Sequence, residues 1–235
     1  MDPIIDYRAA KPTSLVVSKF MNHVYGWMTF GLLITAVVSY VIGNDQELLF
    51  SLRKMMMPLF ILQIGLVLGL SWGINKISVG AATFMFLLYS FVTGVVFSPL
   101  FAVYSINSLG QTFAVTAGAF GGLALYGATT KRDLSAMGTF MVMGLIGILI
   151  AMFANMFFKS SGLDLVVSFL GVIIFSGLTA WDTQKLKTFG MTAQTNSEIG
   201  QKVAIVGALT LYLDFINLFL FLLRFMGGRG SRRDY

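Results

Sequence analysis

Two acidic residues, Asp182 and Asp214, stand inside otherwise apolar stretches of the chain. A charged side chain at membrane depth costs about 3 kcal/mol or more, and such residues usually mark a functional site. Two carboxyl groups close together in a low dielectric do not both ionise easily, so their protons leave in two coupled steps. We therefore expect a proton-controlled latch, which a shared hydrogen bond closes and which repulsion, water or a cation opens.

Asp214 lies about 16 Å along a helix from Val203, where its apolar run begins, which is near the middle of a hydrocarbon core about 30 Å thick. Helical spacing gives it a polar stripe on an otherwise Leu/Phe helix, made of Gly207, Thr210, Asn217, Phe221 and Arg224. Such a stripe should face the inside of a bundle. The alternative is an aspartate that only hydrogen-bonds its neighbours and fixes packing.

Asp182 shares a helix face with Thr179, and Lys185 stands at i+3, where it could pair with the carboxylate on the helix surface. If the helix continues to Phe189, Asp182 lies about 10 Å inside its end. It could then meet Asp214 of the following antiparallel helix. Calcium prefers six to eight oxygen ligands. Both carboxylates, with Thr210, Asn217, carbonyls and water, would form a weak, transient calcium site.

The composition sets the class of protein that must hold these residues. Of 235 residues, 57% are hydrophobic and 11% are charged, against roughly 45–50% and ~25% in soluble domains. This excludes a soluble enzyme, a disordered chain and a peripheral membrane protein. The absence of cysteine excludes disulfides and thiolate sites. The net charge of +6 is spread between apolar runs, which indicates membrane topology rather than nucleic-acid binding.

Seven apolar runs predict an all-α membrane protein with seven transmembrane helices, and no run has the polar alternation of a β-barrel. A polar N-terminal tail is expected over 1–22, a transmembrane domain over 23–226 and a basic tail over 227–235. The predicted spans are 24–42, 55–74, 79–101, 112–128, 137–158, 163–181 and 203–225.

Basic residues predict the orientation, because loops on the cytoplasmic side carry an excess of Lys and Arg. The N-terminal side of the spans holds Arg8, Lys11, Lys19, Lys76, Lys131, Arg132, Lys185, Lys187 and Lys202, whereas the opposite side holds Arg53, Lys54 and Lys159. The N-terminus is therefore expected in the cytoplasm. Seven crossings then place the arginines of the tail 227–235 outside the cytoplasm, against the same rule. One segment that re-enters the membrane without crossing it would avoid this conflict, but we favour seven crossings.

Long motifs resemble the Bax inhibitor-1 family, also called the transmembrane Bax inhibitor motif family. The segment GALTLYLDFINLFL, residues 207–220, resembles its last helix, and GLTAWDTQKLK, residues 177–187, resembles its sixth. Residues 21–33 and 125–135 resemble the first helix and the fourth–fifth loop. The likeness covers nearly the whole chain and is closest to bacterial inner-membrane members. It implies a last helix surrounded by the other six.

The resemblance further implies a pH-sensitive calcium leak channel whose paired aspartates correspond to Asp182 and Asp214. Such a protein is expected to be neither an enzyme nor the holder of a cofactor, since calcium and protons are the ions that it transports. It is expected to lie in the lipid bilayer as a monomer or weak homo-oligomer. A bacterial member has an arginine near the cytoplasmic end of helix two that contacts the latch; here only Lys76 is basic. Gln63 replaces a family acid, which should weaken cation attraction. Expected latch neighbours are Thr179, Thr210, Asn217, Lys76 and Arg224.

Two other functions remain open. An intramembrane aspartyl protease also uses two aspartates on neighbouring helices, but Leu-Tyr-Leu precedes Asp214 in place of Gly-x-Gly. A non-catalytic regulator is the second alternative, since family members are linked to a membrane ATP-dependent protease and to stress or cell-death control. The tail 1–22 is then the expected contact with a protein partner.

Overall fold

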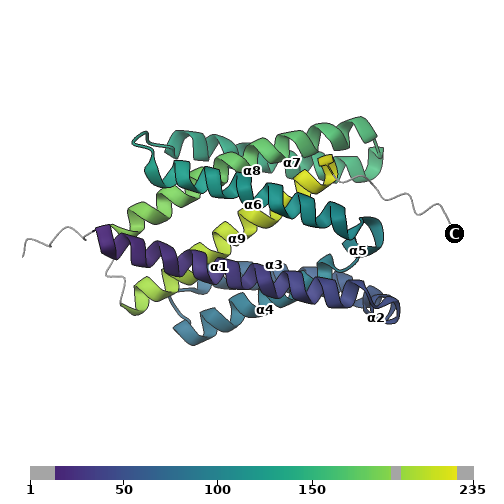
Figure 1. Cartoon of the computed structure of the whole chain (residues 1–235), viewed down its shortest axis with the longest axis horizontal. Coiled ribbons are helices and arrows are strands. Elements are labelled where there is room, and N and C mark those ends of the chain that lie inside the picture. The colour runs from purple at the N-terminus through teal and green to yellow at the C-terminus, as the bar shows by residue number, and fades with distance from the viewer. Residues whose placement is uncertain (1–13, 192–196, 227–235) are drawn as a thin grey trace, which may run out of the picture.

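The computed structural model describes residues 14–191 and 197–226, and these are helical without any strand. The long helices are α1 (Ser14–Gly43), α3 (Met56–Gly73), α4 (Val79–Phe97), α6 (Ile106–Thr129), α7 (Ser135–Phe158), α8 (Ser161–Gly190) and α9 (Glu198–Met226) (Figure 1). Each predicted apolar run coincides with one of them. The sequence did not predict three short pieces: α2 (Gln46–Leu52), the 3₁₀ turn η1 (Arg53–Met55) and α5 (Leu100–Val103).

Short polar connections separate the helices and make chain neighbours antiparallel. Ser78, Ser105 and Ser160 each precede a helix, and each side chain accepts a hydrogen bond from a backbone N–H of its first turn. These caps satisfy donors that have no partner within the helix. After α7 the chain turns at Lys159, whose φ of 49° is left-handed.

Two helices, α1 and α8, extend furthest beyond the predicted spans. α1 begins at Ser14, inside the segment predicted as a tail, and Val17 and Phe20 are already buried there. α8 continues from its apolar part to Gly190, so that Asp182 lies well inside a helix. Both extensions are amphipathic, and an average of hydropathy over a window misses them because their exposed faces are polar. Residues 1–13 and the predicted tail 227–235 lie outside the described residues.

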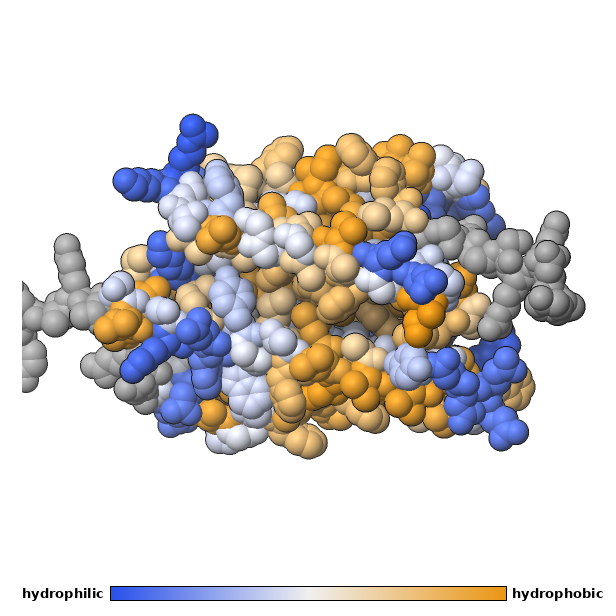
Figure 2. All heavy atoms as spheres, viewed as in Figure 1, coloured by the Kyte–Doolittle hydropathy of each residue, from blue (hydrophilic) through white to orange (hydrophobic). Residues whose placement is uncertain are grey.

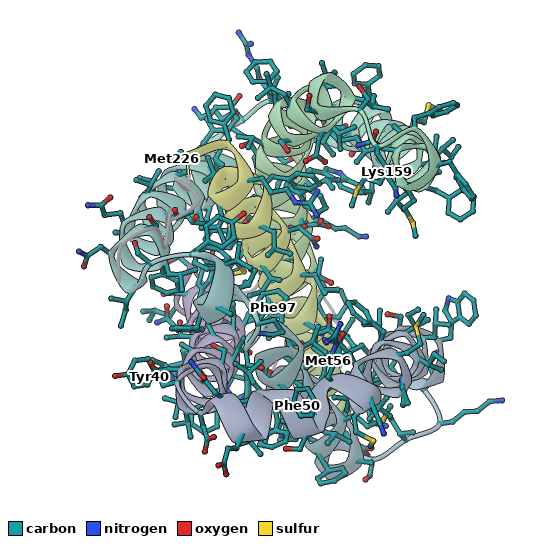
Figure 3. The ribbon with its side chains drawn as sticks, turned by 90° about the vertical axis from the view of Figure 1, so that its right-hand side faces the viewer. Tyr40, Phe50, Met56, Phe97, Lys159 and Met226 are labelled. Carbon is teal, nitrogen blue, oxygen red and sulfur yellow. The ribbon has the colours of Figure 1, made fainter. Side chains whose placement is uncertain are left out.

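The last helix, α9, forms the core of the bundle. Of its most apolar stretch, 67% is buried, against 6% for α7. α9 packs against α1, α4, α6 and α8, while α3 packs chiefly on α4 and α7 chiefly on α8. Figure 3 shows α9 inside an open arc of the other helices, with α7, which ends next to Lys159, at one end of that arc. The structure thus differs from the expected ring of six, since α9 has four main neighbours.

Six of the described helical stretches are long and apolar enough to cross a membrane, with α2 to α3 and α4 to α5 each counted as one. Helix α6 is not among them, although it has 24 residues. Glycine, alanine and threonine fill much of it and lower its hydropathy. Figure 2 shows the apolar side chains over the middle of the molecule and hydrophilic residues toward both ends.

The two ends of the bundle are chemically distinct. We call the end where α1 begins and α8 finishes the N-terminal end; there the rings of Phe20 and Phe189 lie 5.8 Å apart. α6 also finishes there, and α7 begins there (Figure 1). At the opposite end, Arg224 near the end of α9 lies 3.9 Å from Asp164 near the start of α8.

Candidate functional site

Close contact between α8 and α9 sets the register of the site. Gly171 on α8 faces the ring of Phe221 on α9, and Gly207 on α9 faces Leu186 on α8. Because glycine has no side chain, it lets helix backbones approach closely in a membrane. Because the helices are antiparallel, these two contacts flank a central segment of the interface, and Asp182 and Asp214 both lie in it.

The structure brings Asp182 and Asp214 together. Their side chains are direct neighbours that interact, and their exposed fractions are only 9% and 4%. Asp214 Oδ2 is fully buried and has no hydrogen-bond partner among the described residues. A buried polar atom without a partner costs about 1–3 kcal/mol. Asp214 Oδ2 therefore keeps unused capacity to accept a hydrogen bond, which an oxygen in a closed hydrogen-bond network would not have.

Lys185 does not form the expected pair with Asp182. Its side chain is exposed, and its ammonium lies over the ring of Trp181, 5.1 Å from the centroid. No ion pair joins Lys185 to a carboxylate within the described part of the chain, although its charge acts on Asp182. Among residues 14–191 and 197–226, the carboxyl pair thus has no cationic partner in an ion pair.

The three expected polar neighbours bond to their own helices. The Thr179 hydroxyl donates to Phe175 O at 2.7 Å, and the Thr210 hydroxyl donates to Val206 O at 3.1 Å. The Asn217 amide nitrogen donates to Leu213 O at 2.8 Å. Their donors are therefore used, while the hydroxyl oxygens keep lone pairs that can face a cation or water.

Within the described residues, no ion pair joins either expected cationic neighbour to the aspartate pair. Lys76 is exposed in the turn after α3, where its backbone N–H donates to Gly73 O. Arg224 lies ten residues beyond Asp214, about 15 Å along α9, and pairs with Asp164 at the opposite end. Helical spacing correctly predicted that Arg224 lies on the same face of α9 as Asp214. It did not predict that Arg224 lies at the opposite end of the bundle, away from the pair.

Sequence reasoning missed a buried hydroxyl next to Asp182 and the tyrosine that approaches it. Thr183 follows Asp182, and its hydroxyl is fully buried. Tyr25 on α1 approaches Thr183. The position of Thr183 next to Asp182 was a usable signal, whereas nothing in the sequence indicated that α1 would bring Tyr25 to α8.

A second polar cluster lies on another face of α9. The Tyr212 hydroxyl and Thr35 Oγ1 are 2.6 Å apart, and Thr35 Oγ1 donates to Ser90 O at 2.8 Å. Gln63 Nε2 donates to Thr93 Oγ1 at 2.8 Å, so Gln63 lies between α3 and α4 rather than beside the aspartates. We call these five residues the hydroxyl network.

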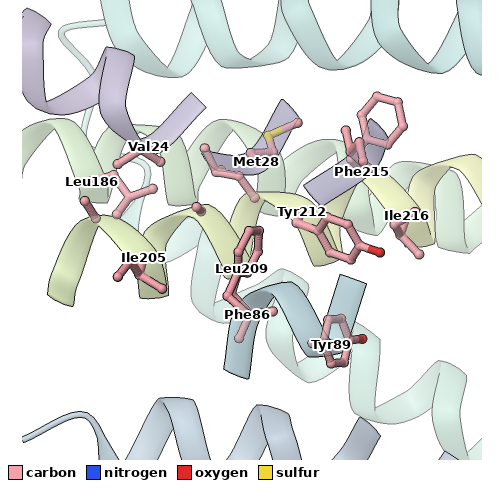
Figure 4. Close-up of a cluster of buried hydrophobic side chains, with 14 of the residues drawn as sticks. Val24, Met28, Phe86, Tyr89, Leu186, Ile205, Leu209, Tyr212, Phe215 and Ile216 are labelled. Carbon is pink, nitrogen blue, oxygen red and sulfur yellow. The ribbon is translucent and has the colours of Figure 1, made fainter. Parts of the chain in front are cut away.

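Aromatic rings surround the network and fix its position. Tyr212 projects from α9 toward α4, where Phe86 and Tyr89 meet its ring edge to face (Figure 4). Tyr212 and Phe86 are fully buried. Each hydroxyl of the network has a hydrogen-bond partner.

The carboxylates are too few for a firmly bound metal. In the part of the chain that the structure describes, no three or more His, Cys, Asp or Glu side chains gather around one point. Two carboxylates supply only part of the six to eight oxygens that calcium prefers. The donor set therefore fits a passing cation better than a resident one.

The chain matches the family described as Inhibitor of apoptosis-promoting Bax1 over residues 17–231, which include both aspartates. It is 49% identical to the inner membrane protein YbhL of Escherichia coli K12 over 232 residues, 97% of each chain. An uncharacterised protein of Borreliella burgdorferi is 47% identical over 96% of this chain and 99% of its own. An uncharacterised protein of Rickettsia prowazekii is 40% identical over 90% of each chain.

Proposed function

The chain belongs to the Bax inhibitor-1 family, as its motifs predict, and we propose that it is a multi-pass inner-membrane protein that leaks calcium or similar cations under control of protons. Asp182 and Asp214 are the proposed sensor and gate. The observation that carries the proposal is the unpartnered Asp214 Oδ2, buried in the interface of two closely packed helices. Cations and protons are cargo, so the protein needs neither catalytic residues nor a bound cofactor.

The gate works through the charge of the pair. With one or two protons bound, the carboxyl groups attract each other through a shared hydrogen bond and hold α8 against α9. When both lose their protons, two negative charges at about 4 Å repel by about 4 kcal/mol at an effective dielectric of 20. Separation of the helices then admits water, and the charges attract a cation that Thr210 and Asn217 help to solvate.

The proposed topology has seven crossings with the N-terminus in the cytoplasm. Helix α6 is the seventh, because its 24 residues span about 36 Å and it packs on α8 and α9 like the other core helices. It leads from α5 to the N-terminal end, where Lys131 and Arg132 follow. That end is the more basic one, which is typical of the cytoplasmic side.

Calcium flux into liposomes that hold the purified full chain tests the proposal. Flux from wild type should change with pH between 5 and 8, whereas Asp182→Asn and Asp214→Asn should each flatten that dependence, because an amide cannot exchange a proton. Asp164→Asn is the matched control, since Asp164 is a carboxylate of α8 at the opposite end. Equal flux from wild type and Asp214→Asn at every pH would overturn the gate.

A further inference from the structure

A polar cleft lies at the N-terminal end, outside the aspartate pair. It encloses about 640 Å³ between the end of α6, the start of α7 and the last turns of α8. The carboxyl pair is not part of it. Its lining combines hydroxyl groups with cationic side chains, among them Thr130, Lys131, Arg132, Ser135, Lys185 and Lys187.

The cleft carries an excess of positive charge. Four cationic side chains line it against one carboxylate, Asp133. The ion pairs in the described part of the chain join Lys202 to Glu198 and Arg224 to Asp164, so none neutralises a cation of the cleft. Hydrogen bonds from the hydroxyl and the backbone N–H of Ser135 lower the pKa of Asp133. Asp133 is thus engaged with the start of α7.

Hydrogen bonds hold the cationic loop against α8. Gln184 accepts from Leu134 N at 2.9 Å and donates to Arg132 O at 2.8 Å. Lys187 donates to Ala128 O at 2.6 Å, which caps the end of α6. The cations therefore project from fixed walls.

We propose that this cleft binds a phosphate group that carries net negative charge, as found in an anionic lipid headgroup or in free phosphate. Several cations and hydroxyls around one cavity suit the oxygens of a phosphate. Basic pockets between transmembrane helices are typical sites for anionic headgroups. Membrane orientation alone explains basic residues at this end, but it does not explain a cleft whose cations lack carboxylate partners.

Native mass spectrometry of the full chain in neutral detergent tests the proposal, with phosphatidylglycerol and phosphatidylcholine as probes. Wild type should retain phosphatidylglycerol in preference to phosphatidylcholine. The double variant Lys131→Gln/Arg132→Gln should bind phosphatidylglycerol about 25-fold more weakly, because each cation near the surface contributes about fivefold. The matched control is Lys19→Gln/Lys76→Gln, which removes two exposed cations outside the cleft and should retain binding.

Added inorganic phosphate separates the two sources. If millimolar phosphate displaces the lipid from wild type, the cleft takes the phosphate group itself; if it does not, the cleft requires the lipid. Both outcomes support the site, provided that the cleft variant alone loses binding. Equal binding by wild type and the cleft variant, or equal loss in both double variants, would overturn it.

Discussion

Helix α9 carries two buried polar sites on different faces, and they differ in whether their polar atoms all have hydrogen-bond partners. Tyr212 belongs to the hydroxyl network, in which each hydroxyl has a partner. Asp214, two residues later, faces Asp182 and keeps one carboxyl oxygen without a partner. Both residues are almost fully buried, so burial alone does not distinguish them.

The difference separates a structural site from a site that can change state. A fully paired network gains nothing from rearrangement, and it fixes the packing around it. An unpartnered buried oxygen is costly, and a proton, a water or a cation relieves that cost. We therefore expect changes in the hydroxyl network to alter stability at every pH, and changes in the aspartate pair to alter the response to pH.

The largest expected effect follows from emptying the centre of the network. Tyr212→Ala removes a fully buried ring between Phe86 and Tyr89, and such truncations cost about 3–5 kcal/mol of unfolding free energy. Unfolding in detergent should show this loss equally at pH 5 and pH 8. Tyr126→Ala, at an exposed tyrosine of α6, is the control. A loss confined to one pH would contradict the structural role.

A smaller effect follows from forcing α8 and α9 apart. In Gly171→Ala the new methyl group would meet the Phe221 ring, which Phe175 supports by stacking. Overpacking of this kind costs about 1–3 kcal/mol, and the loosened interface should raise calcium leak at the pH where wild type is closed. Gly118→Ala is the matched control, because its methyl group would meet nothing within 4 Å. Equal behaviour of the two variants would show that the interface does not hold the gate closed.

Much of the fold was predictable because apolar runs match the thickness of a bilayer. Each long helix overlaps its predicted span, and the polar stripe of α9 correctly predicted that Asp214 faces inward. Helix α6 shows the limit of hydropathy, since small residues reduce it in a helix that still packs on the core. The end of α8 lay beyond the predicted apolar run for a different reason, because its exposed face is polar and lowers the average hydropathy there.

The candidate site was predictable only in part. The meeting of Asp182 with Asp214 followed from antiparallel order along the chain, which sequence provides. The roles expected for Lys76 and Arg224 rested on a family position and on helix spacing, and neither gives the depth at which a side chain lies. The link between Tyr212 and Thr35 joins residues 177 positions apart, and only packing determines such a pair.

A double-mutant cycle measures the strength of the network. Tyr212→Phe and Thr35→Val each remove one end of the 2.6 Å hydrogen bond. A buried hydrogen bond contributes about 0.5–1.5 kcal/mol, so the coupling energy between the two changes should be about 1 kcal/mol. Unfolding free energies of the single and double variants give the value. A coupling near zero would mean that Thr35 and Tyr212 are held by packing alone.

The smallest expected effect tests whether the two sites are independent. Tyr212 points to α1 and α4, and Asp214 points to α8, so they share no hydrogen-bond partner although they are close in sequence. Changes without shared partners usually add within about 0.5 kcal/mol. The unfolding free energies of Tyr212→Phe, Asp214→Asn and the double variant should therefore add within that range at pH 5 and at pH 8. A larger coupling that appears at only one pH would mean that α9 transmits the protonation of the aspartates to the hydroxyl network, and the two sites would then form one switch.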